Sequence, residues 1–265
     1  MNRIEKCFAQ LKERGDKALV CFLTSGDPSF EATEKLVSMI SKSGADIIEL
    51  GIPFSDPLAD GPSIQSASFR ALQAGATVKG VFDNLKAIRK HCDVPIVLMT
   101  YFNPVHKYGL QKFAQDAVDA GADGVILTDL PPEESKDWKT GADTAGLATI
   151  FLLAPTSTKD RIELTAKLAS GFIYCVSRTG VTGARSEMPV ELKALVDTIK
   201  EASDLPVVVG FGVSKPEHVK YVTQIADGAV VGSALVNVIA DHADSDDMFE
   251  HAGEFVRSLK EGTVM

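Results

Sequence analysis

The chain has few of the residues that would build a disulfide framework, a metal site or a thiol nucleophile. Its 265 residues include only four cysteines, and no two of them have Cys-x-x-Cys spacing. Five histidines are present without a His-x-x-x-His pair. Scattered thiols of this kind fit reduced, buried side chains in a cytosolic protein better than a disulfide framework. We therefore expect no metal and no covalent thiol chemistry.

Positive charge is also in the minority. The chain has 27 Lys and Arg against 36 Asp and Glu, which gives a formal net charge of −9 and an isoelectric point near 5.1. A surface of this sign repels nucleic acids and anionic membranes, so neither is expected as a partner. An anionic substrate would need a local binding site.

Long apolar runs are absent as well. No stretch reaches the ~20 apolar residues of a membrane span, and the first six residues are charged and amphipathic. We therefore expect a soluble, cytoplasmic protein. With 45% hydrophobic residues and no break in composition, residues 1–265 are expected to form a single domain with a full core.

What the chain does contain is an alternation of short apolar runs with amphipathic segments of helical length. The continuous apolar character of the runs is typical of parallel strands covered on both faces. Eight strands are predicted, at 18–23, 46–50, 95–100, 124–128, 147–152, 172–176, 206–210 and 228–232. Helices are predicted between them at 29–42, 78–91, 107–120, 133–145, 159–169, 189–200 and 215–225, and one is expected to begin directly after Gly232.

A weak internal repeat supports the same architecture. Four predicted helices end in small residues, and each of these ends is followed at once by a predicted strand. The four ends are at 43–46, 120–123, 169–171 and 225–228. Glycine in the left-handed cap position permits such tight turns. Eight βα units with right-handed crossovers predict an α/β protein of the (β/α)8 TIM-barrel class. Two further helices are predicted in addition to the eight βα units. One is N-terminal, at 2–14, and the other follows the second strand, at 62–74.

Three acidic residues stand at the second strand and in the Pro/Gly-rich loop after it. Burial raises a carboxyl pKa by up to ~3–5 units, so Glu49 at the strand end could hold a proton near neutrality while an aspartate in the loop stays ionised. One acid and one base would then face a single cleft. Alternatively, Glu49 forms an ion pair, and Asp56 and Asp60 are turn or capping residues. Composition does not choose between the two aspartates.

Loops after later strands contain further candidates. Glycine turns at 210–212 and 232–233 could hold a phosphate through backbone N–H groups and a helix N-terminus, which is where phosphate usually sits in this fold. The alternative is that these glycines only serve tight turns and that Ser233 caps a helix. The long polar segment 177–189 is interpreted as a closing lid. Asp129, at the end of the fourth strand, is another candidate at the rim.

Six motifs in the same order resemble the tryptophan synthase alpha subunit family, over about residues 4–260. These are Phe22-Leu-Thr-Ser-Gly-Asp-Pro, Glu49-Leu-Gly-Ile-Pro-Phe-Ser-Asp-Pro-Leu-Ala-Asp60-Gly-Pro, Leu98-Met-Thr-Tyr-Phe-Asn-Pro104, Asp129-Leu-Pro-Pro-Glu-Glu, Ser177-Arg-Thr-Gly-Val-Thr-Gly183 and Gly210-Phe-Gly-Val-Ser. The resemblance implies cleavage of indole-3-glycerol phosphate to indole and glyceraldehyde 3-phosphate, a retro-aldol lyase step in tryptophan biosynthesis that uses no cofactor.

The resemblance also implies roles for residues. Glu49 would protonate indole C3 and take the proton of the glycerol hydroxyl, and Asp60 would hold the ring N–H. Substrate-binding residues would be Phe22, Tyr101, Asp129, Tyr174, Thr182, Gly183, Gly212, Gly232 and Ser233. The partner would be a pyridoxal-phosphate beta subunit in an alpha2beta2 heterotetramer. Its expected contacts are Pro53, Phe54, Asp56, Pro57 and Pro131, although loop prolines often only stiffen a turn.

Three rival functions share parts of this pattern. Another phosphosugar barrel would need a catalytic lysine at a strand end or metal-binding histidines, and the sequence shows neither. A free-standing lyase that releases indole would share every motif. A barrel that only activates a beta chain would have lost one of the two carboxylates, and both are present.

Overall fold

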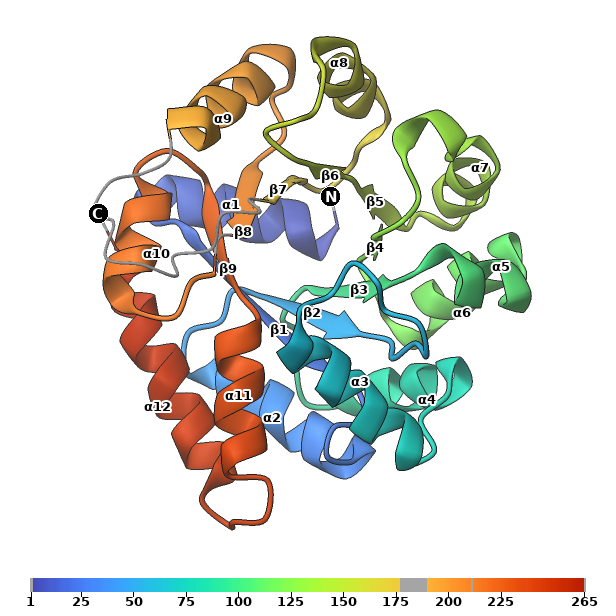
Figure 1. The fold of residues 1–265 in the computed structure, drawn as a ribbon, viewed down its shortest axis with the longest axis vertical. Coiled ribbons are helices and arrows are strands. Elements are labelled where there is room, and N and C mark those ends of the chain that lie inside the picture. Colours follow the sequence, from blue (N-terminus) through green and yellow to red (C-terminus); the bar gives the residue numbers. More distant parts are fainter. Residues whose placement is uncertain (1, 177–189, 211, 265) are drawn as a thin grey trace.

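A nine-stranded parallel sheet, curved into a nearly closed barrel, forms the centre of the molecule. The computed structural model describes residues 2–176, 190–210 and 212–264. Figure 1 shows the strands at the centre and helices around them. The strands are β1 Ala18–Thr24, β2 Ile47–Gly51, β3 Ile96–Thr100, β4 Gly124–Leu127, β5 Ala148–Ile150, β6 Leu152–Leu153, β7 Ile173–Val176, β8 Val207–Gly210 and β9 Gly228–Val231. Their order in the sheet is β5-β4-β3-β2-β1-β9-β8-β7-β6.

The predicted barrel is confirmed, with one strand more than expected. The segment predicted as a strand at 147–152 is divided at Phe151 into β5, which pairs with β4, and β6, which pairs with β7. The chain therefore changes its partner strand within this segment. The carbonyl of Phe151 accepts a hydrogen bond from the N–H of Tyr174 at 3.1 Å, so the barrel continues across the break.

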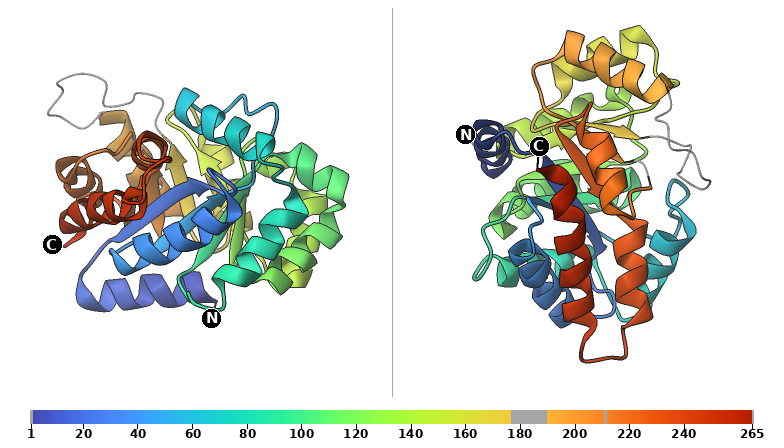
Figure 2. Two further views of the ribbon diagram at one scale, coloured as in Figure 1. Left: turned by 90° about the horizontal axis from the view of Figure 1, so that it is seen from below. Right: turned by 90° about the vertical axis from the view of Figure 1, so that its left-hand side faces the viewer.

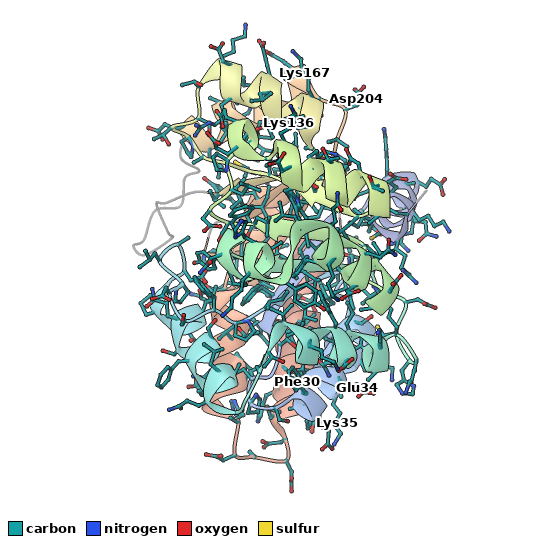
Figure 3. All side chains as sticks on the ribbon, turned by 90° about the vertical axis from the view of Figure 1, so that its right-hand side faces the viewer. Phe30, Glu34, Lys35, Lys136, Lys167 and Asp204 are labelled. Atoms are coloured by element: carbon teal, nitrogen blue, oxygen red, sulfur yellow. The ribbon has the colours of Figure 1, made fainter. Side chains whose placement is uncertain are left out.

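Helices surround the barrel and cover its outer face (Figure 2). Those in the described residues are α1 Arg3–Arg14, α2 Phe30–Lys42, α3 Pro62–Gln73, α4 Val78–Ile88, α5 Phe102–Tyr108, α6 Leu110–Ala120, α7 Lys136–Ala145, α8 Lys159–Leu168, α9 Val190–Ala202, α10 Pro216–Thr223, α11 Ser233–Asp241 and α12 Met248–Lys260, with short 3-10 helices at Pro132–Glu134 and Glu261–Thr263. Charged side chains such as Lys35, Lys136 and Lys167 extend from the outer sides of these helices into solvent (Figure 3). None of the helices in the described ranges is long and apolar enough to cross a membrane.

Two helices differ from the prediction. The helix expected at 107–120 begins earlier and is broken into α5 and α6 at Gly109, whose φ of +99° lies outside the helical region. Helix α12 was not predicted, although Met248, Ala252 and Val256 follow each other at the four-residue spacing of a buried helical face. The N-terminal helix α1 and the extra helix α3 are both present.

Helix α1 closes the end of the barrel where the strands begin. Its apolar residues, including Ile4 and Phe8, pack against inward-facing residues of the sheet such as Ala18 and Ile47. The rings of Phe8 and Phe172 lie 6.0 Å apart between centroids. The opposite end, at the carboxyl ends of the strands, is left for the loops.

The repeated helix exits have a common bonding pattern at the beginning of the strands. Asp46 accepts the N–H of Leu19 at 2.8 Å, and Ile96 and Val207 donate in the same way to the aspartates at 123 and 227. In the repeat at 169–171, which has no aspartate, the hydroxyl of Ser170 accepts the N–H of Thr149 at 2.9 Å. Each of these side chains thus fixes the first residues of the preceding strand.

The three aspartates of this pattern are also ion-paired. Lys260 contacts Asp46 at 2.5 Å, Arg89 contacts Asp123 at 2.7 Å, and Lys200 contacts Asp227 at 3.2 Å. These ion pairs are partly removed from solvent, and each aspartate in them also accepts a backbone N–H. Together the two interactions hold the first residues of the strands in register.

Candidate active site

Glu49 lies inside the barrel, at the middle of β2 and two residues before its carboxyl end. Along this strand Ile47 packs into the barrel interior and Ile48 packs outward against the helices, so alternation turns Glu49 inward. Its register neighbours are Phe22 on β1 and Val97 on β3.

Burial dominates the chemistry of this carboxyl group. Glu49 is 1% exposed, and its Oε1 atom has no hydrogen-bond partner among the described residues. Burial raises the pKa of Glu49 from 4.5 to about 8. The ion pair considered as an alternative role is not found within the part of the chain that the structure covers. Glu49 is therefore mostly protonated near neutral pH.

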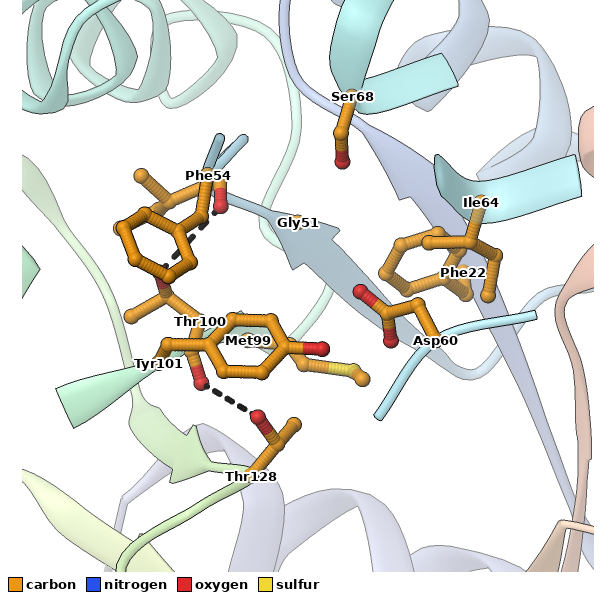
Figure 4. A pocket seen from close by; sticks show the side chains of 11 residues that line it. Phe22, Gly51, Phe54, Asp60, Ile64, Ser68, Met99, Thr100, Tyr101 and Thr128 are labelled. Atoms are coloured by element: carbon orange, nitrogen blue, oxygen red, sulfur yellow. Dashed lines mark hydrogen bonds between the residues drawn. The ribbon is translucent and has the colours of Figure 1, made fainter. Parts of the chain in front are cut away.

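Asp60 stands in the wall of a pocket that Phe22, the register neighbour of Glu49, also lines, whereas Glu49 itself does not line it (Figure 4). Asp60 does not cap α3, because Gly61 occupies the N-cap position and no side chain bonds there. Burial raises the pKa of Asp60 from 3.8 to about 6, and a hydrogen bond from the Tyr101 side chain acts in the opposite direction. Asp60 is therefore mostly ionised at pH 7, where Glu49 is mostly neutral.

The structure also separates the two loop aspartates. Asp56 is exposed, and its carboxylate accepts a hydrogen bond from the Ser55 hydroxyl at 2.6 Å. It does not line the pocket, whereas Asp60 does. Of the two loop aspartates, only Asp60 thus lies where it can meet a ligand in this pocket.

The pocket beside Asp60 has mostly apolar walls. Phe22 and Met99 project from β1 and β3, and Ile64 projects from α3. A methyl group placed on Gly51 would lie 2.8 Å from Cζ of the Phe22 ring, so glycine is needed for this ring to lie against β2. These surfaces suit a flat, apolar ring system.

Tyr101 joins this pocket to the loop that carries Asp60. Its hydroxyl accepts the N–H of Ala59 at 3.0 Å, and its ring lies 5.3 Å from that of Phe54 between centroids. Phe54, predicted as a partner contact, also lines the pocket. The position of the Asp60 backbone thus depends on a side chain that follows β3.

Tyr174, predicted to lie beside the catalytic carboxylate, extends from β7 across the barrel interior. Burial raises its pKa well above the ordinary value, and the negative charge of Glu49 adds to the effect. Its hydroxyl would lie only 2.5 Å from a methyl group placed on Gly210, so that glycine makes room for the ring.

The predicted phosphate-binding residues follow β8 and β9. Gly212 has a φ of +59°, a conformation that favours glycine, and is exposed in the loop after β8. Gly232 is the N-cap of α11, and Ser233 is the first residue of that helix. Ser233 therefore does not cap the helix, contrary to the alternative reading of the sequence. Thr182 and Gly183, with the rest of the predicted lid, lie outside the described residues.

Asp129 has a local role in the structure. Its carboxylate accepts the backbone N–H of Phe102 at 2.6 Å, at the start of α5, and it does not line the pocket. Its contact with substrate stays a prediction.

The predicted partner contacts lie in two rim loops. Pro53 is buried within the chain, whereas Pro57 and Pro131 are half-buried. Leu58, beside Pro57, is 91% exposed, which is unusual for a large apolar side chain. Leu58 was not among the contacts predicted from the sequence.

Several residues of the pocket wall were not predicted from the sequence. These are Gly51, Ile52, Ile64, Ser68, Met99, Thr100 and Thr128. Only the four-residue spacing of Ile64 and Ser68 on one face of α3, and the alternation of Met99 with Tyr101, could have indicated them. No group of three or more metal-ligating side chains is arranged to hold a metal ion in the described ranges.

Comparison with known proteins agrees with the motifs. The family model described as tryptophan synthase alpha chain matches residues 8–264. The chain belongs to the tryptophan synthase alpha chain family. A tryptophan synthase alpha chain of Geobacter sp. (strain M21) is 50% identical over 264 residues, covering 100% of this chain and 98% of the relative.

Solved structures of this family share the fold. The tryptophan synthase subunit alpha from Legionella pneumophila str. Paris has a TM-score of 0.92 at 40% identity, covering 99% of this chain and 98% of that chain. A chain of Mycobacterium tuberculosis tryptophan synthase has a TM-score of 0.91 at 36% identity, covering 100% of this chain and 99% of that chain. Tryptophan synthase alpha chains are lyases that cleave indole-3-glycerol phosphate to indole and glyceraldehyde 3-phosphate.

Proposed function

We propose that Glu49 and Asp60 carry out this cleavage in the present chain. The observation that supports the assignment best is the difference between the two carboxyl groups. Glu49 is buried, its Oε1 atom has no hydrogen-bond partner among the described residues, and its pKa is about 8. Asp60 borders the pocket and has a pKa of about 6. Near pH 7 the site therefore offers one proton donor and one negative charge.

Each group then has a defined step. Glu49 protonates C3 of the indole ring, which leaves a positive charge delocalised to the ring nitrogen, and Asp60 accepts the ring N–H and stabilises that charge. The Glu49 carboxylate next removes the proton of the glycerol hydroxyl. The bond between C3 and the side chain breaks, its electrons restore the aromatic ring, and the hydroxyl carbon becomes the aldehyde of glyceraldehyde 3-phosphate. The chemistry uses side chains alone.

The remaining predicted residues bind the two ends of the substrate. The apolar walls at Phe22 and Tyr101 take the indole ring. The N-terminal end of α11, with Gly232 and Ser233, and the turn at Gly212 take the phosphate through backbone N–H groups. This arrangement explains how a chain with a net charge of −9 binds an anion without a cluster of lysines. Thr182 and Gly183 would complete the site from the lid.

The chain acts as the alpha subunit beside a tryptophan synthase beta subunit, in an alpha2beta2 complex of the cytoplasm. Cleavage of indole-3-glycerol phosphate by the purified chain, alone and with a beta subunit, tests this function. Slow cleavage that accelerates strongly with the beta subunit is expected. Fast cleavage without a response would indicate a free-standing lyase, and no cleavage in either case would contradict the assignment.

The exposed side chain of Leu58 supports the rim loop as the partner-facing surface. Leu58→Asp is expected to leave cleavage by the isolated chain unchanged and to weaken activation by the beta subunit by about tenfold, because a charge would be buried at an apolar contact. Titration of the chain with beta subunit, with the rate of indole formation as readout, measures the effect. Val264→Asp, at a residue with 61% exposure near the C-terminus, is the matched control. Equal loss in both variants would contradict this surface.

The two pKa values predict the pH dependence of kcat/KM. The reactive form has neutral Glu49 and ionised Asp60, so the rate falls below about pH 6 as Asp60 gains a proton, and above about pH 8 as Glu49 loses its proton. A bell-shaped profile with a maximum near pH 7 is expected from initial rates of indole formation. A rate that keeps rising through pH 9 would contradict the role of Glu49 as the acid.

A further inference from the structure

Most hydroxyl groups of the pocket are already engaged in hydrogen bonds. Thr100 Oγ1 donates to the carbonyl of Ile52 at 3.3 Å, and Thr128 Oγ1 donates to the carbonyl of Thr100 at 3.3 Å, as drawn in Figure 4. The hydroxyl of Tyr101 accepts the N–H of Ala59 and contacts Asp60. These groups hold the wall in place and have limited capacity for a ligand.

Ser68 differs from them. It is 5% exposed, and its side chain extends from α3 into the pocket (Figure 4). Within the residues that the structure covers, its hydroxyl has no hydrogen-bond partner, and the nearby wall is formed by apolar groups such as Ile64 and Phe22. A polar group in such surroundings favours a ligand or a water molecule that can satisfy it.

The position of Ser68 relative to Asp60 defines which part of a ligand it meets. Asp60 stands two residues before Pro62, the first residue of α3, and Ser68 stands six residues after Pro62, or ~9 Å along the helix axis. With the ring N–H held at Asp60, as the proposed function requires, the benzene part of an indole ring extends along the apolar wall toward α3. The free hydroxyl then faces the substituents of that ring rather than its nitrogen.

We propose that Ser68 is a specificity-determining residue that lets this pocket accept indole rings carrying one hydroxyl group on the benzene ring. This inference rests on the proposed function. The reaction is the reverse of cleavage: a bond forms between C3 of the hydroxyindole and the aldehyde carbon of glyceraldehyde 3-phosphate, C3 loses its proton, and the aldehyde oxygen gains one. No oxidant or reductant is needed. The ring hydroxyl exchanges its hydrogen bonds with water for one with Ser68.

The test is a comparison of kcat/KM for condensation of glyceraldehyde 3-phosphate with indole and with the four isomers that carry one hydroxyl on the benzene ring. The unmodified chain is compared with Ser68→Ala and with Ser66→Ala. Ser66 lies on the same helix but is exposed, which makes it a matched control. Alanine is well tolerated in helices, so neither variant is expected to perturb folding.

We expect at least one isomer to be condensed and its kcat/KM to fall about 3- to 10-fold in Ser68→Ala, the range for one neutral hydrogen bond. The value for indole is expected to change less than about twofold, and Ser66→Ala is expected to behave as the unmodified chain. The proposal would be overturned if the ratio of kcat/KM for the hydroxyindole to kcat/KM for indole were the same in all three proteins. It would also be overturned if indole were condensed but no hydroxyindole were. Failure to condense indole itself would overturn the proposed function as well.

Discussion

Replacing Glu49 with glutamine is expected to lower kcat for cleavage of indole-3-glycerol phosphate by about 10⁴-fold, the upper end of what general acid–base groups contribute. The expected effect is large because the proposed mechanism uses Glu49 in both proton transfers, and glutamine can neither give nor take a proton. Glutamine has nearly the same shape, so KM is expected to change little. Single-turnover formation of indole and binding of substrate to the variant measure the two effects separately.

A second measurement checks that Glu49→Gln preserves the fold. The folded chain holds a proton on Glu49 up to about pH 8, whereas the unfolded chain releases it near the ordinary value of 4.5. Between these values the unfolded state binds fewer protons, so the free energy of unfolding falls by ~1.4 kcal/mol per pH unit from this group. Glutamine does not titrate, so the variant does not lose this part of the free energy of unfolding as the pH rises. The variant should therefore gain stability relative to the unmodified chain as pH rises, measured by chemical denaturation at about pH 5 and about pH 9. Turnover close to that of the unmodified chain would refute the role of Glu49.

Asp60→Asn is expected to lower kcat by about 10²- to 10³-fold, a range typical for the loss of one preorganised group that stabilises developing charge. The asparagine side chain still lines the pocket, but it carries no negative charge opposite the cationic ring nitrogen. The acidic limb of the pH profile near pH 6, which belongs to Asp60, is also expected to disappear. Initial rates across the pH range record both changes.

The neighbouring aspartate provides the control. Asp56→Asn alters the same loop by the same chemical change, but Asp56 is exposed and lies outside the pocket. Its turnover without the beta subunit is expected to stay within about twofold, as for most surface substitutions. A larger loss in Asp56→Asn than in Asp60→Asn would reverse the assignment of the second carboxylate.

The sequence was sufficient to predict the barrel and the acid inside it, because both depend on local patterns. Apolar runs at even spacing predict parallel strands, and Glu49 stands at the end of such a run. The break at Phe151 could not be seen in the same way. Its cause is the exchange of one neighbouring strand for another, which depends on pairing across the sheet rather than on the residues of that segment.

The pocket wall shows the same limit. Phe22 and Tyr101 were found through family motifs, whereas Ser68 and Thr128 come from separate elements and meet only after the barrel closes. Asp56 and Asp60 are equivalent by composition, and only the packing of the loop against Tyr101 separates them. Residues that meet only through contacts between separate elements therefore need a structure to be found, whereas an acidic residue within a buried apolar run, such as Glu49, does not.

The aspartates at the strand starts have a practical consequence for protein engineering. They fix β1, β3 and β8 at the end of the barrel closed by α1, whereas Asp60 lies in the loop that follows β2 at the other end. A library of variants that diversifies only the loops after the strands leaves every one of these anchors unchanged. New ring specificities can therefore be selected at one end of the barrel while the residues that secure the strands at the other end stay constant.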